Sequence, residues 1–153
     1  MNRAAALALL LGGCAGGPAV PDPWADVAAA SGLRMSDDQE TAFVKAVETL
    51  AARKDGRLPA RLELHLDREM SRAKPLPERA RAAAVRALAA YAPRESARDL
   101  LWAVLKDAAE PPPVRSASFE ALRAYEGDAL RPRVLAAPSA EDPWLSALQT
   151  RLR

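Results

Sequence analysis

The sequence predicts an all-α protein built from stacked pairs of helices. Apolar residues recur at intervals of three and four along most of the chain, which is the spacing of one helix face. Alanine, leucine and arginine dominate and aromatic residues make up only 5% of the chain, a composition that suits helices packed closely through small side chains. A segment of twelve residues also recurs at an offset of 34 residues, a period typical of stacked helical pairs.

The N-terminus has the layout of an export signal. Met1-Asn2-Arg3 carries one positive charge, Ala4 to Leu11 is apolar without interruption, and Leu11-Gly12-Gly13-Cys14 follows. The apolar run is far shorter than the roughly 20 residues that a membrane-spanning helix needs. The stretch resembles a bacterial lipoprotein signal with its lipobox, with Gly12 where that family more often has alanine or serine. The resemblance implies that residues 1–13 are removed and that Cys14 becomes the lipidated first residue of the mature chain.

An ordinary buried thiol is the alternative for Cys14, since free cysteine packs like a small hydrophobe. Glycines flank it on both sides and the chain has no second cysteine, so neither burial nor a disulfide is favoured. Residues 14–23 contain repeated glycine and proline, and we expect a lipidated cysteine and a flexible tether there. The helical domain is then expected over residues 24–153.

A short helix over Trp24 to Leu33, ended by Gly32, is expected to open the domain. Ser36 to Gln39 is a capping box, and it predicts a helix that ends near Asp55-Gly56. Its expected core residues are Phe43, Ala46, Val47, Leu50 and Ala51.

A second helix is expected from Pro59, with Leu62, Leu66 and Met70 on one stripe. The alternation of leucine with polar residues over 62–66 would also fit a strand. Residues 67–72 continue with helix formers and no turn intervenes, so we predict that the helix continues through them.

The repeated segments are Ala80 to Tyr91 and Val114 to Tyr125, which match at half of their positions. Each is followed by another predicted helix: residues 95–109 after the first copy, and residues 129–137, interrupted by Pro132, after the second. A last helix is expected over 143–152. The expected core residues of the first and last of these helices are Leu101, Val104, Leu105, Ala108, Leu145, Leu148 and Leu152.

The pattern Val114-Arg115-x-Ala117-x-x-x-Ala121-Leu122 resembles the first helix of a bacterial HEAT-type repeat, and Ala80 to Leu88 repeats it with alanine for the leading valine. The resemblance covers residues 78–137. It implies a short right-handed α-solenoid of three HEAT-like helical hairpins plus a capping helix, with divergent outer units. An irregular bundle of four to six helices is the structural alternative.

Few groups are available for catalysis or metal binding. His65 is the only histidine, so neither a histidine pair nor a Cys/His zinc site can be assembled, and no phosphate-binding loop is present. We expect no catalytic residue, metal or cofactor, and His65 is interpreted as a partly exposed surface residue, although a lone general base is conceivable. The net charge of only +2 gives no reason to expect nucleic acid.

One stripe of side chains suggests a binding face. Arg98, Trp102 and Lys106 are spaced by four residues, beside the expected core stripe. Second helices line the concave face of such repeats, and tryptophan and arginine are frequent interface anchors. Trp102 could instead pack under the neighbouring repeat. Further arginines that could extend the face are Arg61, Arg68, Arg72, Arg131 and Arg133.

These features together predict a membrane-anchored, non-catalytic protein-binding adaptor or scaffold. Its partners would be proteins of the cell envelope, and lipidation would hold it near them. The alternative is a binder of anionic lipid or cell-wall polymer through an arginine-rich face; an enzyme is the less favoured third class. Ala15 follows the cysteine in place of the aspartate that retains many enteric lipoproteins in the inner membrane. We therefore expect an outer-membrane location facing the periplasm.

Overall fold

The computed structural model describes residues 22–30, 35–67 and 76–153, and these residues form helices and connecting turns without a strand. The all-α prediction is therefore confirmed for this part of the chain. The predicted signal, Cys14, Gly32, Arg68, Met70 and Arg72 lie outside the described residues. In chain order the elements are α1 (Pro23–Ala29), α2 (Asp37–Ala52), α3 (Leu58–Leu66), α5 (Glu78–Ala89), α6 (Glu95–Lys106), α7 (Pro112–Glu126), the short 3-10 helix η1 (Gly127–Ala129), α8 (Leu130–Ala136) and α9 (Pro143–Leu152).

Local capping residues account for several of the helix starts. The Ser36 hydroxyl accepts from the Gln39 amide at 3.3 Å and the Gln39 side chain accepts from the Ser36 amide at 2.9 Å, so the predicted capping box is confirmed. Asp22 caps α1 by accepting from the Trp24 amide at 3.0 Å. Helix α9 begins and ends where the sequence predicts, with Asp142 as its N-cap.

Four predicted helix boundaries or interruptions are wrong. Helix α1 ends at Ala29 and not at the predicted Leu33, because Ala30 is already in a turn. Helix α3 ends at Leu66 because Asp67 leaves the helical region with ψ near 132°, so the predicted continuation fails at its first residue. Helix α6 ends at Lys106, which leaves Ala108 exposed in the following turn rather than in the core. Pro132 does not interrupt α8, because it lies in the first turn of the helix, where an N–H has no intrahelical partner to lose.

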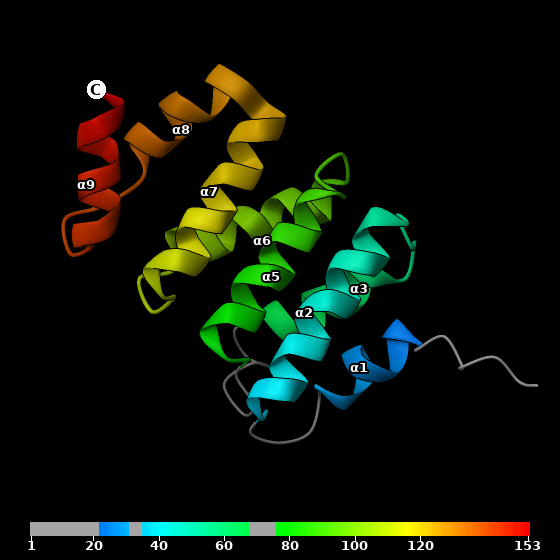
Figure 1. Cartoon of the computed structure of the whole chain (residues 1–153). Coiled ribbons are helices and arrows are strands. Elements are labelled where there is room, and N and C mark those ends of the chain that lie inside the picture. The colour runs from blue at the N-terminus through cyan, green and yellow to red at the C-terminus, as the bar shows by residue number, and fades with distance from the viewer. Residues whose placement is uncertain (1–21, 31–34, 68–75) are drawn as a thin grey trace, which may run out of the picture.

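The helices pack around one core. Helix α5 lies between α2 and α7 and contacts both, while α3 packs against α5 and α6, and α6 packs against α7 (Figure 1). The five predicted core residues of α2 are all buried, as are Leu62, Leu66, Leu101 and Leu105. Leu148 and Leu152 are only partly buried, since α9 contacts α8 and leaves much of α7 uncovered.

One hydrogen-bonding position recurs along the chain at the 34-residue interval. Arg81 donates to the carbonyls of His65 and Leu66 at the end of α3, at 3.0 and 3.1 Å. Arg115 donates to the Leu105 carbonyl at the end of α6 at 2.9 Å. Gln149 donates to the Val134 and Ala137 carbonyls around the end of α8 at 2.9 and 2.7 Å. Arg81 and Arg115 thus satisfy carbonyls that a helix C-terminus leaves without intrahelical donors, and Gln149 adds a side-chain donor at the end of α8.

The two arginines at this position also hold carboxylates. Arg81 forms a buried bidentate ion pair with Glu110, in the turn before α7. Arg115 pairs with Asp142, the N-cap of α9, with N–O distances of 2.9 and 2.5 Å. The Arg115 guanidinium holds the pKa of the Asp142 carboxyl below its usual range. Each arginine therefore ties the end of one helix to the turn that starts another.

Helix α1 is fixed to the turn between α2 and α3. The Trp24 indole nitrogen donates to the Asp55 carboxylate at 3.1 Å, and the Arg57 guanidinium lies 4.5 Å from the Trp24 ring centroid. The Tyr91 hydroxyl donates to the Asp55 backbone carbonyl at 2.8 Å. Helix α1 therefore packs beside this turn, and α9 lies at the opposite end of the molecule (Figure 1).

Candidate functional site

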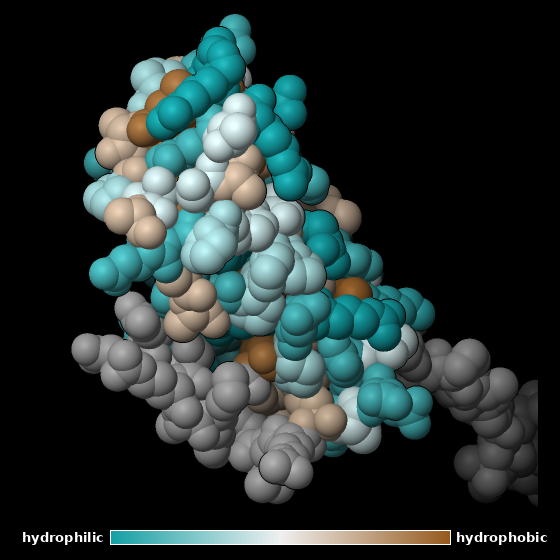
Figure 2. All heavy atoms as spheres, turned by 90° about the vertical axis from the view of Figure 1, so that its left-hand side faces the viewer, coloured by the Kyte–Doolittle hydropathy of each residue, from teal (hydrophilic) through white to brown (hydrophobic). Residues whose placement is uncertain are grey.

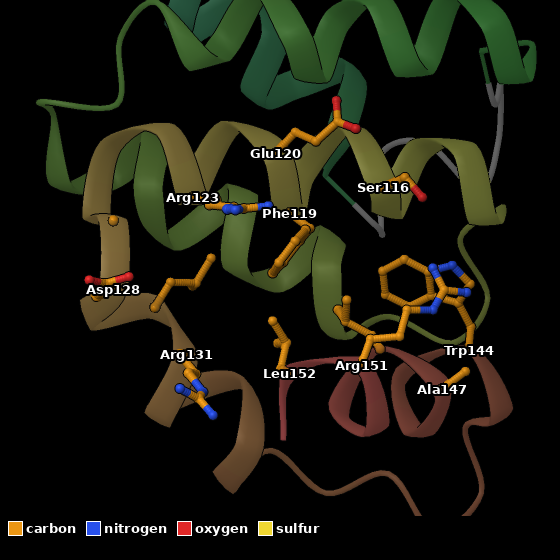
Figure 3. A pocket seen from close by; sticks show the side chains of 13 residues that line it. Ser116, Phe119, Glu120, Arg123, Asp128, Arg131, Trp144, Ala147, Arg151 and Leu152 are labelled. Carbon is orange, nitrogen blue, oxygen red and sulfur yellow. The ribbon is translucent and has the colours of Figure 1, made fainter.

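A groove of about 540 Å³ lies between α7 on one side and η1, α8 and α9 on the other. Its volume is in the range of ligand-binding clefts. The apolar side chains that line it come from all three α-helices, and Figure 3 shows Phe119 of α7 directed toward Leu152 of α9. The apolar lining consists of Phe119, Leu130, Trp144, Ala147, Leu148 and Leu152.

The groove exists because α9 is held to α7 at one end only. The Arg115–Asp142 ion pair fixes the N-terminus of α9, and the Arg115 guanidinium also lies 4.3 Å from the Trp144 ring centroid. The rest of α9 is held by Gln149, which binds the end of α8 instead of α7. The apolar faces of α7 and α9 are therefore opposed without closing on each other.

Charged side chains border the groove. Arg123, Arg131 and Arg151 line it together with Glu120 and Asp128. The Arg131 guanidinium donates to the Arg153 carbonyl at 3.2 Å, whereas the guanidinium groups of Arg123 and Arg151 form no hydrogen bond or ion pair with any described residue. Figure 3 shows the Glu120 carboxylate directed away from α9. The charges available to a ligand in the groove are thus mainly guanidinium groups.

The face of the molecule that carries α9 is largely hydrophilic. In Figure 2 the strongly hydrophobic atoms on this face form small spots separated by hydrophilic ones. Scattered apolar atoms are normal on a protein surface, whereas a broad apolar patch would indicate a large interface. This face therefore shows no broad apolar patch.

The predicted binding stripe lies on α6, and its side chains already contact other parts of the chain. Arg98 donates to the carbonyls of Ala92 and Pro93 at 2.9 and 3.0 Å, and its guanidinium lies 5.2 Å from the Tyr125 ring centroid. The half-buried Trp102 ring has the Lys106 ammonium at 5.4 Å and the Arg133 guanidinium at 4.6 Å from its centroid. A partner would have to displace some of these contacts to use the stripe.

The other predicted binding residues are not gathered into one site. Arg61 is half-buried on α3, which packs against α5 and α6, and Arg68 lies outside the described residues. Arg131 lines the α7–α9 groove, while Arg133, on the same helix, pairs with Glu126 at 2.6 Å and covers Trp102. Of the predicted arginines that the structure describes, Arg131 alone lines the groove.

His65 is half-buried, which agrees with the expected partly exposed position. Its ring meets the ring of Phe43 edge to face at a centroid distance of 5.9 Å, and its Nε2 atom is buried without a hydrogen-bond partner among the described residues. Burial, together with the charge of Arg61, lowers the pKa of His65 below its usual 6.5. Packing against Phe43 thus accounts for a neutral His65 side chain at this position without a catalytic role.

The described residues contain neither a metal-binding cluster nor a membrane-spanning helix. Within the described ranges, no cluster of three or more histidine, cysteine, aspartate or glutamate side chains could hold a metal ion. None of the helices that the structure describes combines the length and apolar composition needed to cross a bilayer. Comparison of the chain with protein-family models, with curated proteins and with solved structures finds no significant match.

Sequence reasoning missed the groove residues Phe119, Trp144, Arg123 and Arg151. A signal for one of them is present in the repeat itself, because Phe119 stands 34 residues after the fully buried Val85. The larger phenylalanine at this position of the second repeated segment indicates that its side chain has different neighbours from those of Val85. The opening between α7 and α9 depends on how α9 docks, and no local pattern encodes that docking.

Proposed function

We propose that this protein is a lipid-anchored, non-catalytic adaptor of the bacterial cell envelope that binds a protein partner in the α7–α9 groove. The observation that carries the proposal is the groove's combination of an apolar lining with two guanidinium groups that no described residue engages. Aromatic and arginine side chains in a recessed surface are typical anchors of protein interfaces. We also propose that the protein uses no cofactor.

The architecture we propose for the adaptor is a short right-handed solenoid of HEAT-like hairpins. The 34-residue recurrence of Arg81, Arg115 and Gln149, each bound to the end of the preceding helix, supports it. The adjacent packing of α2, α5 and α7, with α3 and α6 packed together, also agrees with it. A stack of this kind would give the partner a rigid docking surface.

The proposed anchor is a lipid on Cys14, reached through the tether expected before α1. The groove lies at the far end of the molecule from α1 (Figure 1), the first described helix after the expected tether. This placement favours a protein partner over the membrane that carries the anchor. We propose that the membrane is the outer membrane and that the domain faces the periplasm.

Anionic lipid or cell-wall polymer is the second candidate ligand. The three groove arginines favour it, since guanidinium groups bind phosphate and carboxylate well. Binding of this kind would weaken strongly as salt concentration rises, whereas an adaptor held by apolar anchors would tolerate moderate salt.

Site-specific photocrosslinking in cells tests the proposal. A benzophenone amino acid replaces Ala147, an exposed residue that lines the groove, and in a matched strain it replaces Ala52, an exposed residue at the end of α2. We expect a discrete protein adduct from position 147 and none from position 52, with mass spectrometry identifying the adduct. Adducts of equal yield at the two positions, or only lipid or glycan adducts at position 147, would contradict the adaptor.

A further inference from the structure

We propose that the groove between α7 and α9 binds an acidic peptide segment that carries large apolar side chains. The inference rests on the proposed adaptor function and specifies the chemistry of its partner. It follows from the charge of the groove, from its apolar lining and from its place in the molecule.

The charge of the groove selects for an acidic ligand. Arg123 and Arg151 are exposed, come from opposite walls and have no ion-pair partner among the described residues. Of the two lining carboxylates, Glu120 points away from α9 (Figure 3). Two carboxylates of a ligand could therefore pair with the two guanidinium groups, one on each wall.

The apolar lining selects for side chains that can enter it. Phe119, Leu148 and Leu152 are each partly exposed, although they pack against the core. Covering these surfaces would remove apolar area from water, and a ligand made only of charged groups would leave it exposed. A purely ionic polymer is therefore a poor fit, and an acidic segment with Leu, Phe or Trp side chains is a good one.

The shape and position of the groove favour a peptide over a bilayer. A flat headgroup surface cannot enter a recess of about 540 Å³ between two helices, whereas a single peptide segment can. The groove is also at the end of the molecule opposite α1, from which the chain leads back to Cys14 (Figure 1).

Selection from a random peptide library tests the proposal directly. The full chain carrying Cys14→Ser is immobilised, and a display library of random 12-residue peptides is selected against it. We expect the enriched peptides to combine Asp or Glu with Leu, Phe or Trp. Phe119→Ala should weaken their binding about thirtyfold, the effect of truncating an interface anchor.

A charge-reversed variant gives a readout that a purely structural role would not change. With Arg123→Glu and Arg151→Glu together, the same selection should enrich basic instead of acidic peptides, because the preference follows the sign of the groove. The matched control reverses two exposed arginines outside the groove, Arg53→Glu and Arg86→Glu, and should still enrich acidic peptides.

The outcomes separate this inference from the adaptor proposal. Failure to enrich any peptide, an enriched set that lacks acidic residues, or an acidic set unaffected by reversal of Arg123 and Arg151 would overturn the inference. If a protein adduct still forms at position 147 in cells, the adaptor stands and only its partner's chemistry is wrong. If no protein adduct forms at position 147 either, both the adaptor proposal and this inference are wrong. If dodecyl phosphate or anionic vesicles displace every enriched peptide and their binding is lost in the Arg123→Glu, Arg151→Glu variant, the groove binds anionic lipid and the inference is overturned.

Discussion

At the scale of single residues, the buried arginines Arg81 and Arg115 each combine two tasks. Arg115 is 2% exposed, and its guanidinium satisfies a helix-end carbonyl of α6 while neutralising the carboxylate that caps α9. Taking a charge out of water costs several kcal/mol unless its partner is present, so the pair is sensitive to the loss of either member.

Replacing Arg115 with methionine should lower the free energy of unfolding by about 3 to 5 kcal/mol, because Asp142 would stay buried and charged without its partner. Urea denaturation of the full chain carrying Cys14→Ser measures this. Adding Asp142→Asn should recover most of the loss, since asparagine still caps the helix and carries no charge. Arg86→Met, at an exposed position of α5, should change stability by less than about 0.5 kcal/mol. An equal loss for Arg86 and Arg115 would contradict the assigned role.

His65 should make stability depend on pH in a defined window. Burial lowers its pKa in the folded state below 6.5, so the unfolded chain binds the proton more readily. The free energy of unfolding should therefore be highest above pH 6.5 and decrease as the pH falls toward the folded-state pKa, by at most about 1.4 kcal/mol per pH unit.

The His65→Phe variant should lose this dependence, because a phenyl ring can keep the contact with Phe43 and does not titrate. Urea unfolding of both proteins at several pH values between 7.5 and 5.5 compares the slopes. Parallel pH profiles for the two proteins would show that His65 titrates alike in the folded and unfolded states.

The sequence locates these arginines but not their partners. Arg81 and Arg115 stand at the same place in the two repeated segments, so their equivalence is readable from the spacing. Glu110 and Asp142 lie in turns, and which carboxylate meets which guanidinium depends on tertiary packing. Composition likewise identifies His65 as the one histidine, but its contact with Phe43 joins two different helices.

At the scale of helices, α7 packs against both α5 and α6 and contributes buried residues to the core. Leu122 is fully buried on it, while Ala124, two residues further, is exposed. Leu122→Asp should destabilise the fold by about 4 kcal/mol or more, because a buried charge would have no partner. Circular dichroism should then show loss of the cooperative thermal transition. Ala124→Asp also introduces an aspartate, but on the exposed side of α7, and should preserve the cooperative transition. If this variant loses the transition too, burial of Leu122 is not the cause of the destabilisation.

Helix ends divide into those that local sequence encodes and those that it does not. Ser36 and Asp142 cap their helices with their own side chains, and the sequence identifies both starts. Helices α3 and α6 have Asp67 and Asp107 as their C-caps, without glycine or proline at either position. Helix propensity favours continuation at both places, so sequence patterns overextend these helices.

At the scale of the whole molecule, the anchor is the most direct prediction. Cys14→Ser should block lipidation and leave unprocessed precursor, because the modification is expected to precede cleavage before Cys14. Metabolic labelling with a clickable fatty acid, followed by gel analysis, measures this. Retention of the label by the serine variant would contradict the lipid anchor, as would a chain that is never labelled at all.

The groove shows what a pattern of helices leaves undetermined. The spacing of apolar residues predicts α7 and α9 and most of their inward residues, but it places Leu148 and Leu152 in a closed core. The angle at which α9 docks decides whether they are covered. That angle is set by Asp142 and Gln149, at the start and near the end of α9, through their contacts with Arg115 of α7 and with the end of α8.

Position 149, which follows Arg81 and Arg115 at the 34-residue interval, carries glutamine in place of arginine. This change affects how readily α9 opens locally. Arg81 and Arg115 each bind through an ion pair and a helix end, whereas Gln149 binds through neutral hydrogen bonds alone. Amide hydrogens of α9 should therefore exchange with deuterium fastest among the long helices of the C-terminal half, and those of α5 and α7 slowest. Helix α9 would then open locally at the groove while α5 and α7 stay folded, so a ligand could enter without global unfolding. Exchange in α9 as slow as in α7, measured by mass spectrometry, would rule this out.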